Sequence, residues 1–338
     1  MHDVARIAGV SVKTVSNVVN DYPHVSPGTR SRVLQAIEQL DYRPNLSARG
    51  LRSGRTGVIG LAVPALRENY FAELADSIIR EAETRGLGVL VEQTSGDRDA
   101  ELRTVSGGRL RFMDGLLFSP VSLGQADVDA LNVGFPLVLL GERIFDGPTD
   151  HVAMHNVSAA RAAVEHLVSI GRRRIALIGA ELDAGDEASS STLRLRGYRQ
   201  ALERAGIPLD PALVRPSAHW SRTAGAAATR QLLQESVPFD AIFTLNDTLG
   251  LGALRALGEA GISVPEQVAL VGFDNIDEAQ YSVPSLTSVD PGREQIAALA
   301  VEMLVERINE KGEPRPPRTV QPEFRIVRRE STGFSDES

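Results

Sequence analysis

Residues 3–20 read DVARIAGVSVKTVSNVVN and predict two short helices that cross at a glycine. The first helix covers residues 3–8 and is mostly apolar. Gly9 then permits a tight turn, because glycine adopts positive φ at little steric cost. Ser11 is a good N-cap for a second helix over residues 12–20. This stretch therefore predicts a helix-turn-helix at the start of the chain.

The second helix has an apolar stripe at Val15, Val18 and Val19, which occupy the i, i+3 and i+4 positions of a buried face. Ser26 and Pro27 supply a cap and a first-turn proline for a third helix. The apolar residues of that helix are Val33, Ala36, Ile37 and Leu40. These stripes predict a small three-helix core, although a plain helical hairpin would show the same caps.

Charge is distributed unevenly along the chain. The net charge is −8, which taken alone argues against a nucleic-acid partner. Residues 1–56 nevertheless carry eight Lys or Arg against four Asp or Glu, a charge of +4, so the remaining residues carry −12. A basic N-terminal segment, here called the head, followed by an acidic remainder, the body, is expected when only the head contacts the phosphates of a nucleic acid.

Composition excludes several classes of protein. The 338 residues are enough for two or three domains with sizeable cores. The chain has no cysteine, which excludes disulfides, zinc–cysteine sites and thiol catalysis and suits the cytoplasm. It shows neither a secretory signal nor an apolar run long enough to span a bilayer. We therefore expect a cytoplasmic protein, associated with the nucleoid when it is bound to DNA.

The head resembles the LacI/GalR family of bacterial repressors, and the similarity continues along nearly the whole chain. The matching segments are Asp3-Val4-Ala5-Arg6-Ile7-Ala8-Gly9-Val10-Ser11, Thr14-Val15-Ser16, Val25-Ser26, Thr29-Arg30 and Asp41-Tyr42-Arg43-Pro44-Asn45. The resemblance implies an all-α helix-turn-helix head with a hinge helix. It also implies an α/β body of two Rossmann-like lobes similar to periplasmic binding proteins.

In that family the second helix enters the major groove of DNA. By position, Val12, Lys13 and Asn17 are the best candidates for base contacts, with Thr14 and Ser16 on the same face. Lysine can reach guanine O6/N7, and asparagine can pair with adenine. Asn17 departs from the arginine of many members, which leaves the operator sequence open. His24 and Thr29 are expected at the DNA backbone or outer base pairs.

Residues 45–52 match the family's hinge helix. Asn45, Ala48 and Leu51 share one face, and Leu51 matches the leucine that members insert into the minor groove at the operator centre. A helix of this length is marginal in isolation, so we expect it to order on DNA. A plain interdomain linker is the alternative.

Beyond Thr56, strand-like apolar runs alternate with amphipathic helices, which indicates parallel sheets covered by helices on both faces. The predicted strands are 57–63, 88–94, 115–118, 136–140, 174–178, 241–244, 268–273, 286–289 and 324–327, and the predicted helices are 70–85, 99–112, 193–205 and 248–260. Ligands of such sheets bind beyond the carboxyl ends of the strands, and between two lobes that means the cleft.

Polar and aromatic residues follow several of these strands. The resemblance implies that Arg194, Asn246 and Asp274 hold polar groups of an effector. It also implies that an aromatic at Trp220, the only tryptophan, stacks on the ligand. Tyr70 and Phe71 match the aromatic position after the first strand, although either could be lobe core.

Three further positions are ambiguous. Asp247 is expected to cap the helix that follows it rather than touch ligand. His155-Asn156 stands where the family often has Asp-Asn, and in Asp290-Pro291 the second residue stands where a polar side chain such as Gln is frequent. These departures leave the identity of the ligand open.

Enzymatic motifs are missing. The sequence has no phosphate loop of the GxxxxGK[ST] type, no HExxH and no GxSxG. Gly250-Leu251-Gly252 opens like a dinucleotide fingerprint, but Arg255 stands where its third glycine belongs. We therefore expect no enzyme, no cofactor and no metal. A sugar-binding transport receptor resembles the body, but it would have a signal peptide and no DNA-binding head.

The expected domains are a helix-turn-helix at 1–44, a hinge and linker at 45–56, an effector and dimerisation domain at 57–330, and a tail at 331–338. Within the body we expect one lobe from about 57–156 plus 288–318 and the other from about 157–287 plus 319–330. The expected function is that of a homodimeric repressor whose affinity for a near-palindromic operator changes with a small sugar-like effector. A purine-type regulator, in which the ligand strengthens DNA binding, is the alternative.

Overall fold

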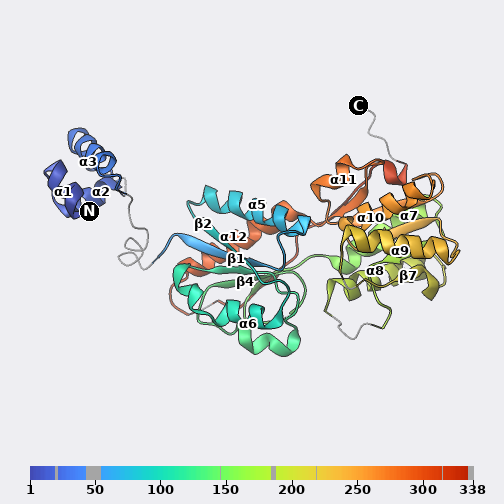
Figure 1. Ribbon diagram of the computed structural model, residues 1–338. Helices are drawn as coiled ribbons and strands as arrows, with labels where there is room; N and C mark the ends of the chain where they lie inside the picture. Colours follow the sequence, from blue (N-terminus) through green and yellow to red (C-terminus); the bar gives the residue numbers. More distant parts are fainter. Residues whose placement is uncertain are drawn as a thin grey trace. The chain divides into compact units, whose positions relative to one another are not determined.

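The computed structural model describes residues 1–19, 22–42, 55–144, 146–183, 188–217, 219–313 and 315–333. The chain forms two compact units, Met1–Gly57 and Val58–Ser338, which we call the head and the body (Figure 1). Among the described residues, no helix is both long enough and apolar enough to cross a membrane.

The head is a bundle of three helices: α1 (His2–Ala8), α2 (Val12–Val19) and α3 (Pro27–Gln39). Gly9 ends α1 at φ 64°, the left-handed conformation that its place in the turn requires. The Ser11 hydroxyl accepts a hydrogen bond from the Thr14 N–H at 3.1 Å, as expected of an N-cap. The core contains Val4, Ala5, Ala8, Val15, Val18, Val33 and Ala36. Leu40, expected in this core, is instead exposed, because it lies just beyond the last turn of α3.

The body contains two six-stranded sheets with the same strand order. The first runs β11-β5-β4-β3-β1-β2, and all its strands are parallel. Its strands are β1 (Val58–Val63), β2 (Gly88–Gln93), β3 (Leu116–Phe118), β4 (Leu137–Leu140), β5 (Asp150–Val152) and β11 (Thr319–Val320). We call this sheet and its helices the first lobe.

The second sheet runs β12-β10-β9-β8-β6-β7 and belongs to the second lobe. Its strands are β6 (Ile175–Ile178), β7 (Val214–Arg215), β8 (Ala241–Thr244), β9 (Ala269–Phe273), β10 (Thr287–Asp290) and β12 (Arg325–Val327). The edge strand β12 pairs antiparallel with β10, and the other pairs are parallel.

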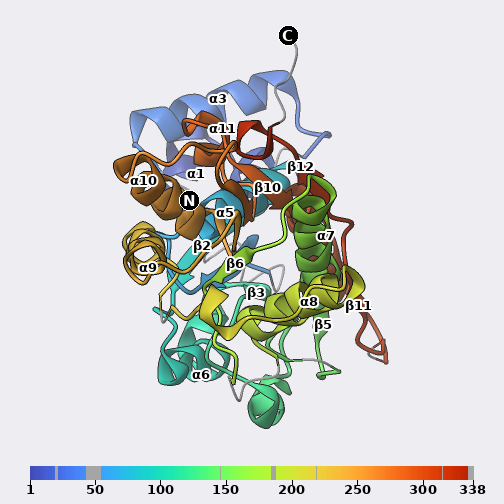
Figure 2. The same cartoon turned by 90° about the vertical axis from the view of Figure 1, so that its right-hand side faces the viewer.

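Helices cover both sheets. In the first lobe, α5 (Asn69–Thr84) and α12 (Arg293–Asn309) lie on one face, and α6 (Arg98–Ser106) lies on the other (Figure 1). In the second lobe, the pair α7 (Asn156–Ser169) and α8 (Ser190–Arg204) lies opposite the pair α9 (Arg222–Gln234) and α10 (Asp247–Glu259) (Figure 2). A short helix, α11 (Asp277–Tyr281), follows β9.

The glycines of α9 and α10 permit close helix packing. A Cβ on Gly225 would lie 2.1 Å from the Leu249 carbonyl oxygen, and one on Gly252 would lie 2.0 Å from that of Arg222. Gly252 belongs to the stretch that opens like a dinucleotide fingerprint. The close packing of this helix pair explains why a glycine stands at position 252, so a nucleotide-binding role is not needed to explain it.

The chain passes between the lobes three times, after β5, after β10 and after β11. The expected boundaries at 288 and 319 lie a few residues too early. Strand β10 extends the second sheet to Asp290, and β11 at Thr319–Val320 still pairs with β5 of the first sheet. Hydrophobic pattern alone could not assign these short strands, because strands of both sheets are apolar.

One predicted helix is wrong in detail. Residues 99–112 form α6 followed by a 3-10 helix at Gly108–Phe112, and not one continuous helix. Gly107 between them is extended, with φ −81° and ψ 161°. Two adjacent glycines at 107 and 108 disfavour helix, which explains the break. The other predicted elements differ from the observed ones by a few residues at most.

Candidate functional site

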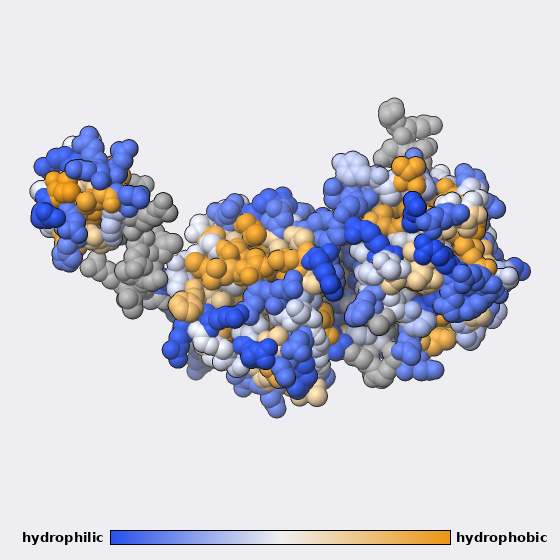
Figure 3. Space-filling view, viewed as in Figure 1, coloured by the Kyte–Doolittle hydropathy of each residue, from blue (hydrophilic) through white to orange (hydrophobic). Residues whose placement is uncertain are grey.

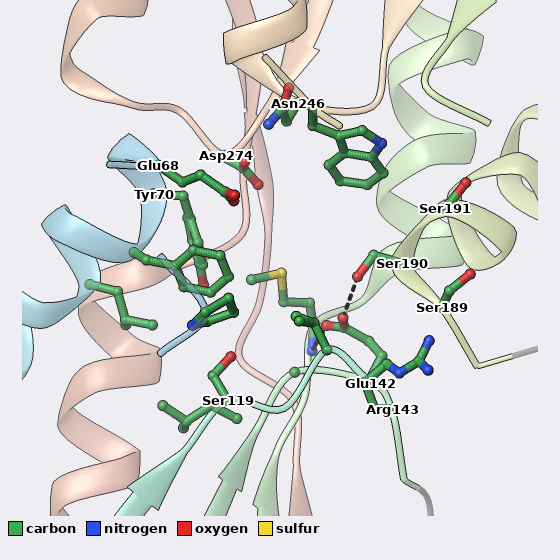
Figure 4. A pocket seen from close by; sticks show the side chains of 18 of the residues that line it. Glu68, Tyr70, Ser119, Glu142, Arg143, Ser189, Ser190, Ser191, Asn246 and Asp274 are labelled. Atoms are coloured by element: carbon green, nitrogen blue, oxygen red, sulfur yellow. Dashed lines mark hydrogen bonds between the residues drawn. The ribbon is translucent and has the colours of Figure 1, made fainter. Parts of the chain in front are cut away.

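A cavity of about 430 Å³ lies between the two lobes, at the carboxyl ends of their strands. Its size is typical of small-molecule sites, and its location agrees with the rule for open parallel sheets. All six residues expected to bind an effector line it: Tyr70, Phe71, Arg194, Trp220, Asn246 and Asp274. Figure 4 shows polar side chains from both lobes pointing into this space.

Arg194 of α8 is buried at the base of the cavity. Its Nε donates to the Asn156 side-chain oxygen at 2.7 Å, and its NH1 donates to the Leu245 carbonyl. Its guanidinium lies 3.6 Å from the centre of the Phe273 ring. These contacts hold the side chain in one orientation, because an arginine fork with several fixed partners loses its rotamer freedom.

Asp274 directly follows β9 and faces Arg194. One carboxylate oxygen lies 3.6 Å from the Arg194 NH2 group. The residue adopts φ 104°, a conformation rare for any residue but glycine and often found at functional sites. Burial raises the pKa of Asp274 from 3.8 to about 7, against the opposing effect of Arg194 and Arg293. The carboxylate is therefore poised to change charge near neutral pH.

At the start of α10, Asn246 rather than Asp247 caps the helix. Asn246 is the N-cap, and its Oδ1 accepts from the Leu249 N–H at 2.8 Å while the residue also lines the cavity. Asp247 is fully buried and accepts from the Ser288 hydroxyl at 2.6 Å. The expectation that Asp247 caps the helix is therefore wrong. Its carboxylate instead links α10 to β10. Gly272 leaves room for this carboxylate because it has no Cβ atom.

Aromatic side chains form the walls of the cavity. Trp220 follows β7, and its indole N–H donates to the Gly179 carbonyl at 3.1 Å. Tyr70 and Phe71, at the start of α5, make an edge-to-face pair with ring centroids 5.3 Å apart. Both also pack against the hydrophobic core of the first lobe. Each of these two residues therefore packs against the lobe core and also lines the cavity.

Sequence reasoning missed several lining residues. The first group, Glu142 and Arg143, follows β4, and the second, Ser189, Ser190 and Ser191, begins α8. The Ser190 hydroxyl donates to Glu142 across the cleft at 2.8 Å, as the dashed line in Figure 4 shows. Glu142 and Arg143 follow β4, and the three serines follow β6. The rule that a polar residue after a strand lies at the ligand-binding edge, which identified Asp274, would therefore also have identified Glu142.

Glu101 of α6 organises a loop that reaches the cavity. It is fully buried, and its carboxylate accepts main-chain hydrogen bonds from Val121, Ser122 and Leu123 at 2.8–3.2 Å. Val121 is itself a lining residue. Glu101 therefore positions one wall of the site without touching the ligand space.

The two residues that depart from the family pattern, His155 and Pro291, do not line the cavity, and their neighbours Asn156 and Asp290 have different roles. Asn156 holds Arg194, and its side-chain nitrogen is buried without a hydrogen bond among the described residues. Asp290 does not line the cavity. It accepts from the Gly292 N–H at 3.0 Å and from Arg325, in the segment that crosses between the lobes. Asp290 therefore belongs to the connection rather than to the ligand site.

In the head, α2 presents the residues expected to contact DNA. Lys13 is exposed, and Val12, Thr14, Ser16 and Asn17 are half-buried beside it. Beyond α2, His24 is exposed and Thr29 is half-buried at the start of α3. Asn45, Ala48 and Leu51 lie outside the described residues. Among those that are described, no group of three His, Asp or Glu side chains could hold a metal ion.

Comparisons with known proteins agree with this geometry. The family model for bacterial regulatory proteins of the lacI family matches residues 1–45, and that for a periplasmic binding protein-like domain matches residues 164–332. The ribose operon repressor of Escherichia coli (strain K12) is 32% identical over 312 residues, which cover 92% of this chain and 93% of the relative. Curated relatives of this kind are DNA-binding regulators and not enzymes.

Solved structures give the same result. A LacI-family transcriptional regulator from Sanguibacter keddieii has a TM-score of 0.77 and 49% identity, covering 83% of this chain and all of that one. The lac repressor dimer bound to operator and the anti-inducer ONPF has a TM-score of 0.82 and 28% identity, covering 98% of each chain. This chain therefore belongs to the LacI family of bacterial transcriptional regulators.

Proposed function

We propose that this regulator represses transcription as a homodimer on a near-palindromic operator and that a small sugar-like effector in the inter-lobe cavity changes its affinity for DNA. One observation carries the proposal. Arg194, Asp274 and Asn246 converge on a cavity with aromatic walls, an arrangement suited to a compact ligand with several hydroxyl groups. The family relationship to the ribose operon repressor supports this ligand class.

The DNA-binding role rests on α2. Its exposed Lys13 and its neighbour Asn17 have the lengths and hydrogen-bonding groups needed to read base edges. Val12 adds an apolar contact, while Thr14, Ser16, His24 and Thr29 are suited to phosphates or outer base pairs. We propose that Leu51 inserts at the operator centre, with Asn45 and Ala48 on the same face of a hinge helix.

Exposed apolar residues on both lobes support the homodimer. In the first lobe, the exposed apolar residues Leu90, Val91 and Phe112 lie together around the edge strand β2. Figure 3 shows apolar surface on this lobe. In the second lobe, Tyr281 is 74% exposed and Val283 is 94% exposed. Exposed apolar residues that lie together commonly mark a protein interface. A second copy would cover it and place two heads on one operator.

Effector action follows from the contacts between lobes. Glu142 of the first lobe bonds Ser190 of the second, and Asn69 bonds Glu278. A ligand that contacts both lobes would favour one lobe arrangement, and dimer geometry would transmit that change to the two heads. By linkage, DNA and ligand then change each other's affinity by the same factor. Because its target is chromosomal, we infer that the protein acts in the cytoplasm.

The alternative is a regulator for which a purine strengthens DNA binding. The aromatic walls formed by Trp220, Tyr70 and Phe71 favour it, since they could stack on a planar base. The sign of the ligand effect separates the two functions.

The test begins with selection of an operator fragment by the purified full-length protein. Sugars, nucleosides and purine bases are then titrated while fluorescence anisotropy reports the DNA complex. We expect a sugar to release the fragment. A purine that tightens the complex would favour the alternative, and failure to select any fragment would contradict both.

A further inference from the structure

Two carboxylates from opposite lobes face each other across the cavity. Glu68 is the N-cap residue of α5 in the first lobe, and Asp274 follows β9 in the second. Figure 4 shows the two carboxylates pointing toward one another. Burial is the main cause of the raised pKa of Asp274, and the charge of Glu68 makes a small further contribution.

Neither carboxylate has its hydrogen-bonding capacity filled by the described residues. The Glu68 side chain makes no hydrogen bond or ion pair with any of them. Asp274 is only 6% exposed, yet its carboxylate accepts no hydrogen bond from them and has only the Arg194 contact at 3.6 Å. Buried carboxylates are normally satisfied by hydrogen bonds or cations, so this arrangement leaves acceptors available to a ligand.

Two guanidinium groups line the cavity among the described residues, and both already have partners: the Arg143 Nε donates to the Leu123 carbonyl at 2.9 Å. Arg194 directs its nitrogens to Asn156, Leu245 and Asp274. A third carboxylate, Glu142, also lines the space. A phosphate or carboxylate on the ligand would therefore approach three acidic side chains while the nearest guanidinium is already engaged.

Aromatic rings lie beside the carboxylates. Tyr70 and Phe71 line the cavity next to Glu68 on the same helix. The π-face of an aromatic ring attracts an ammonium group, and the attraction strengthens where water is excluded. No group of three acidic or histidine side chains among the described residues could coordinate a metal, so an organic cation fits this site better.

We propose that the effector carries a positively charged amino group, as amino sugars do, and that this group binds between the carboxylates of Glu68 and Asp274. The inference rests on the proposed function, since it specifies the class of ligand for that site. An ammonium group there would contact both lobes at once and would stabilise their approach. The hydroxyl groups of the amino sugar would remain available to Asn246.

The experiment compares matched pairs of sugars by isothermal titration on the full-length protein: glucosamine with glucose, galactosamine with galactose, and mannosamine with mannose. In at least one pair we expect the amino sugar to bind roughly tenfold tighter, since charge-assisted hydrogen bonds are stronger than neutral ones. Neutral sugars that bind as tightly as their amino partners would overturn the inference. So would the absence of binding by all three amino sugars.

Glu68→Gln tests the location of the amino group. This variant keeps the shape of the side chain and is expected to reduce the preference for the amino sugar to less than about threefold. Glu83→Gln, at an exposed position of the same helix, is the matched control and should retain the preference. An unchanged preference in Glu68→Gln would overturn the proposed location.

Operator binding separates this inference from the proposed function. If a neutral sugar releases the selected DNA fragment and amino sugars have no advantage, the repressor function stands and the amine inference fails. If the protein selects no fragment, the proposed function fails, whereas the sugar titrations still report on the pocket.

Discussion

Replacing Asp274 with asparagine is expected to stabilise the protein increasingly as the pH rises from about 5 to about 8. The folded protein holds a proton on Asp274 up to a pH of about 7, because burial raises its pKa from the ordinary 3.8. The unfolded chain releases that proton near pH 4. Folding therefore binds a proton in this window, and the wild-type protein loses stability as the pH rises through it.

The size of the effect follows from the two pKa values. A folded pKa of about 7 against 3.8 is a difference of roughly three pH units, and each unit corresponds to about 1.4 kcal/mol. Across the whole window the wild type loses about 4 kcal/mol, of which about 3 kcal/mol falls between pH 5 and pH 8. Asparagine is nearly isosteric, has no charge to lose and tolerates the positive φ at this position.

Urea unfolding at several pH values measures this difference, with fluorescence of the single tryptophan as the probe. Trp220 lies in the same cavity as Asp274, so it reports unfolding of the relevant region. Asp76→Asn, at an exposed carboxylate of α5, is the matched control. A stability difference between Asp274→Asn and wild type that stays constant with pH, or that grows as the pH falls, would refute the reasoning.

Three further predictions concern other parts of the molecule. Lys13→Ala should reduce discrimination between bases at one operator position by about 1–3 kcal/mol in anisotropy titrations with substituted fragments. A loss of affinity that is equal for all fragments, together with a weaker dependence of affinity on salt, would show that Lys13 contacts a phosphate instead. Glu101→Ala should destabilise the body by about 3 kcal/mol in urea unfolding and weaken effector binding, because three main-chain N–H groups lose their acceptor. Glu83→Ala is its control, and equal stability of the two variants would contradict this role. Val283→Glu should shift the protein toward monomers in analytical ultracentrifugation, since it introduces a charge on the exposed apolar surface; an unchanged mass would exclude Val283 from the interface.

Much of this protein could be predicted from its sequence, because the relevant signals are local. Gly9 and Ser11 define the turn and the cap of the helix-turn-helix through backbone conformation and a hydrogen bond three residues away. Alternation of apolar strands and amphipathic helices similarly predicts parallel sheets. Asp274 could be identified as a pocket residue because a polar side chain directly after a buried strand lies at the ligand-binding edge of such a sheet.

The tertiary structure alone decided which distant residues meet. Glu68 and Asp274 are separated by about two hundred residues of sequence and face each other only because three chain crossings bring the lobes together. The assignment of β10 and β11 to their sheets also depended on long-range pairing. The sequence predicted that Asp247 caps α10, but its carboxylate is buried and accepts a hydrogen bond from Ser288. Such a long-range hydrogen bond leaves no periodic pattern in the sequence, so it could not be predicted. Local interactions thus determined the elements, and non-local packing determined the chemistry of the cavity.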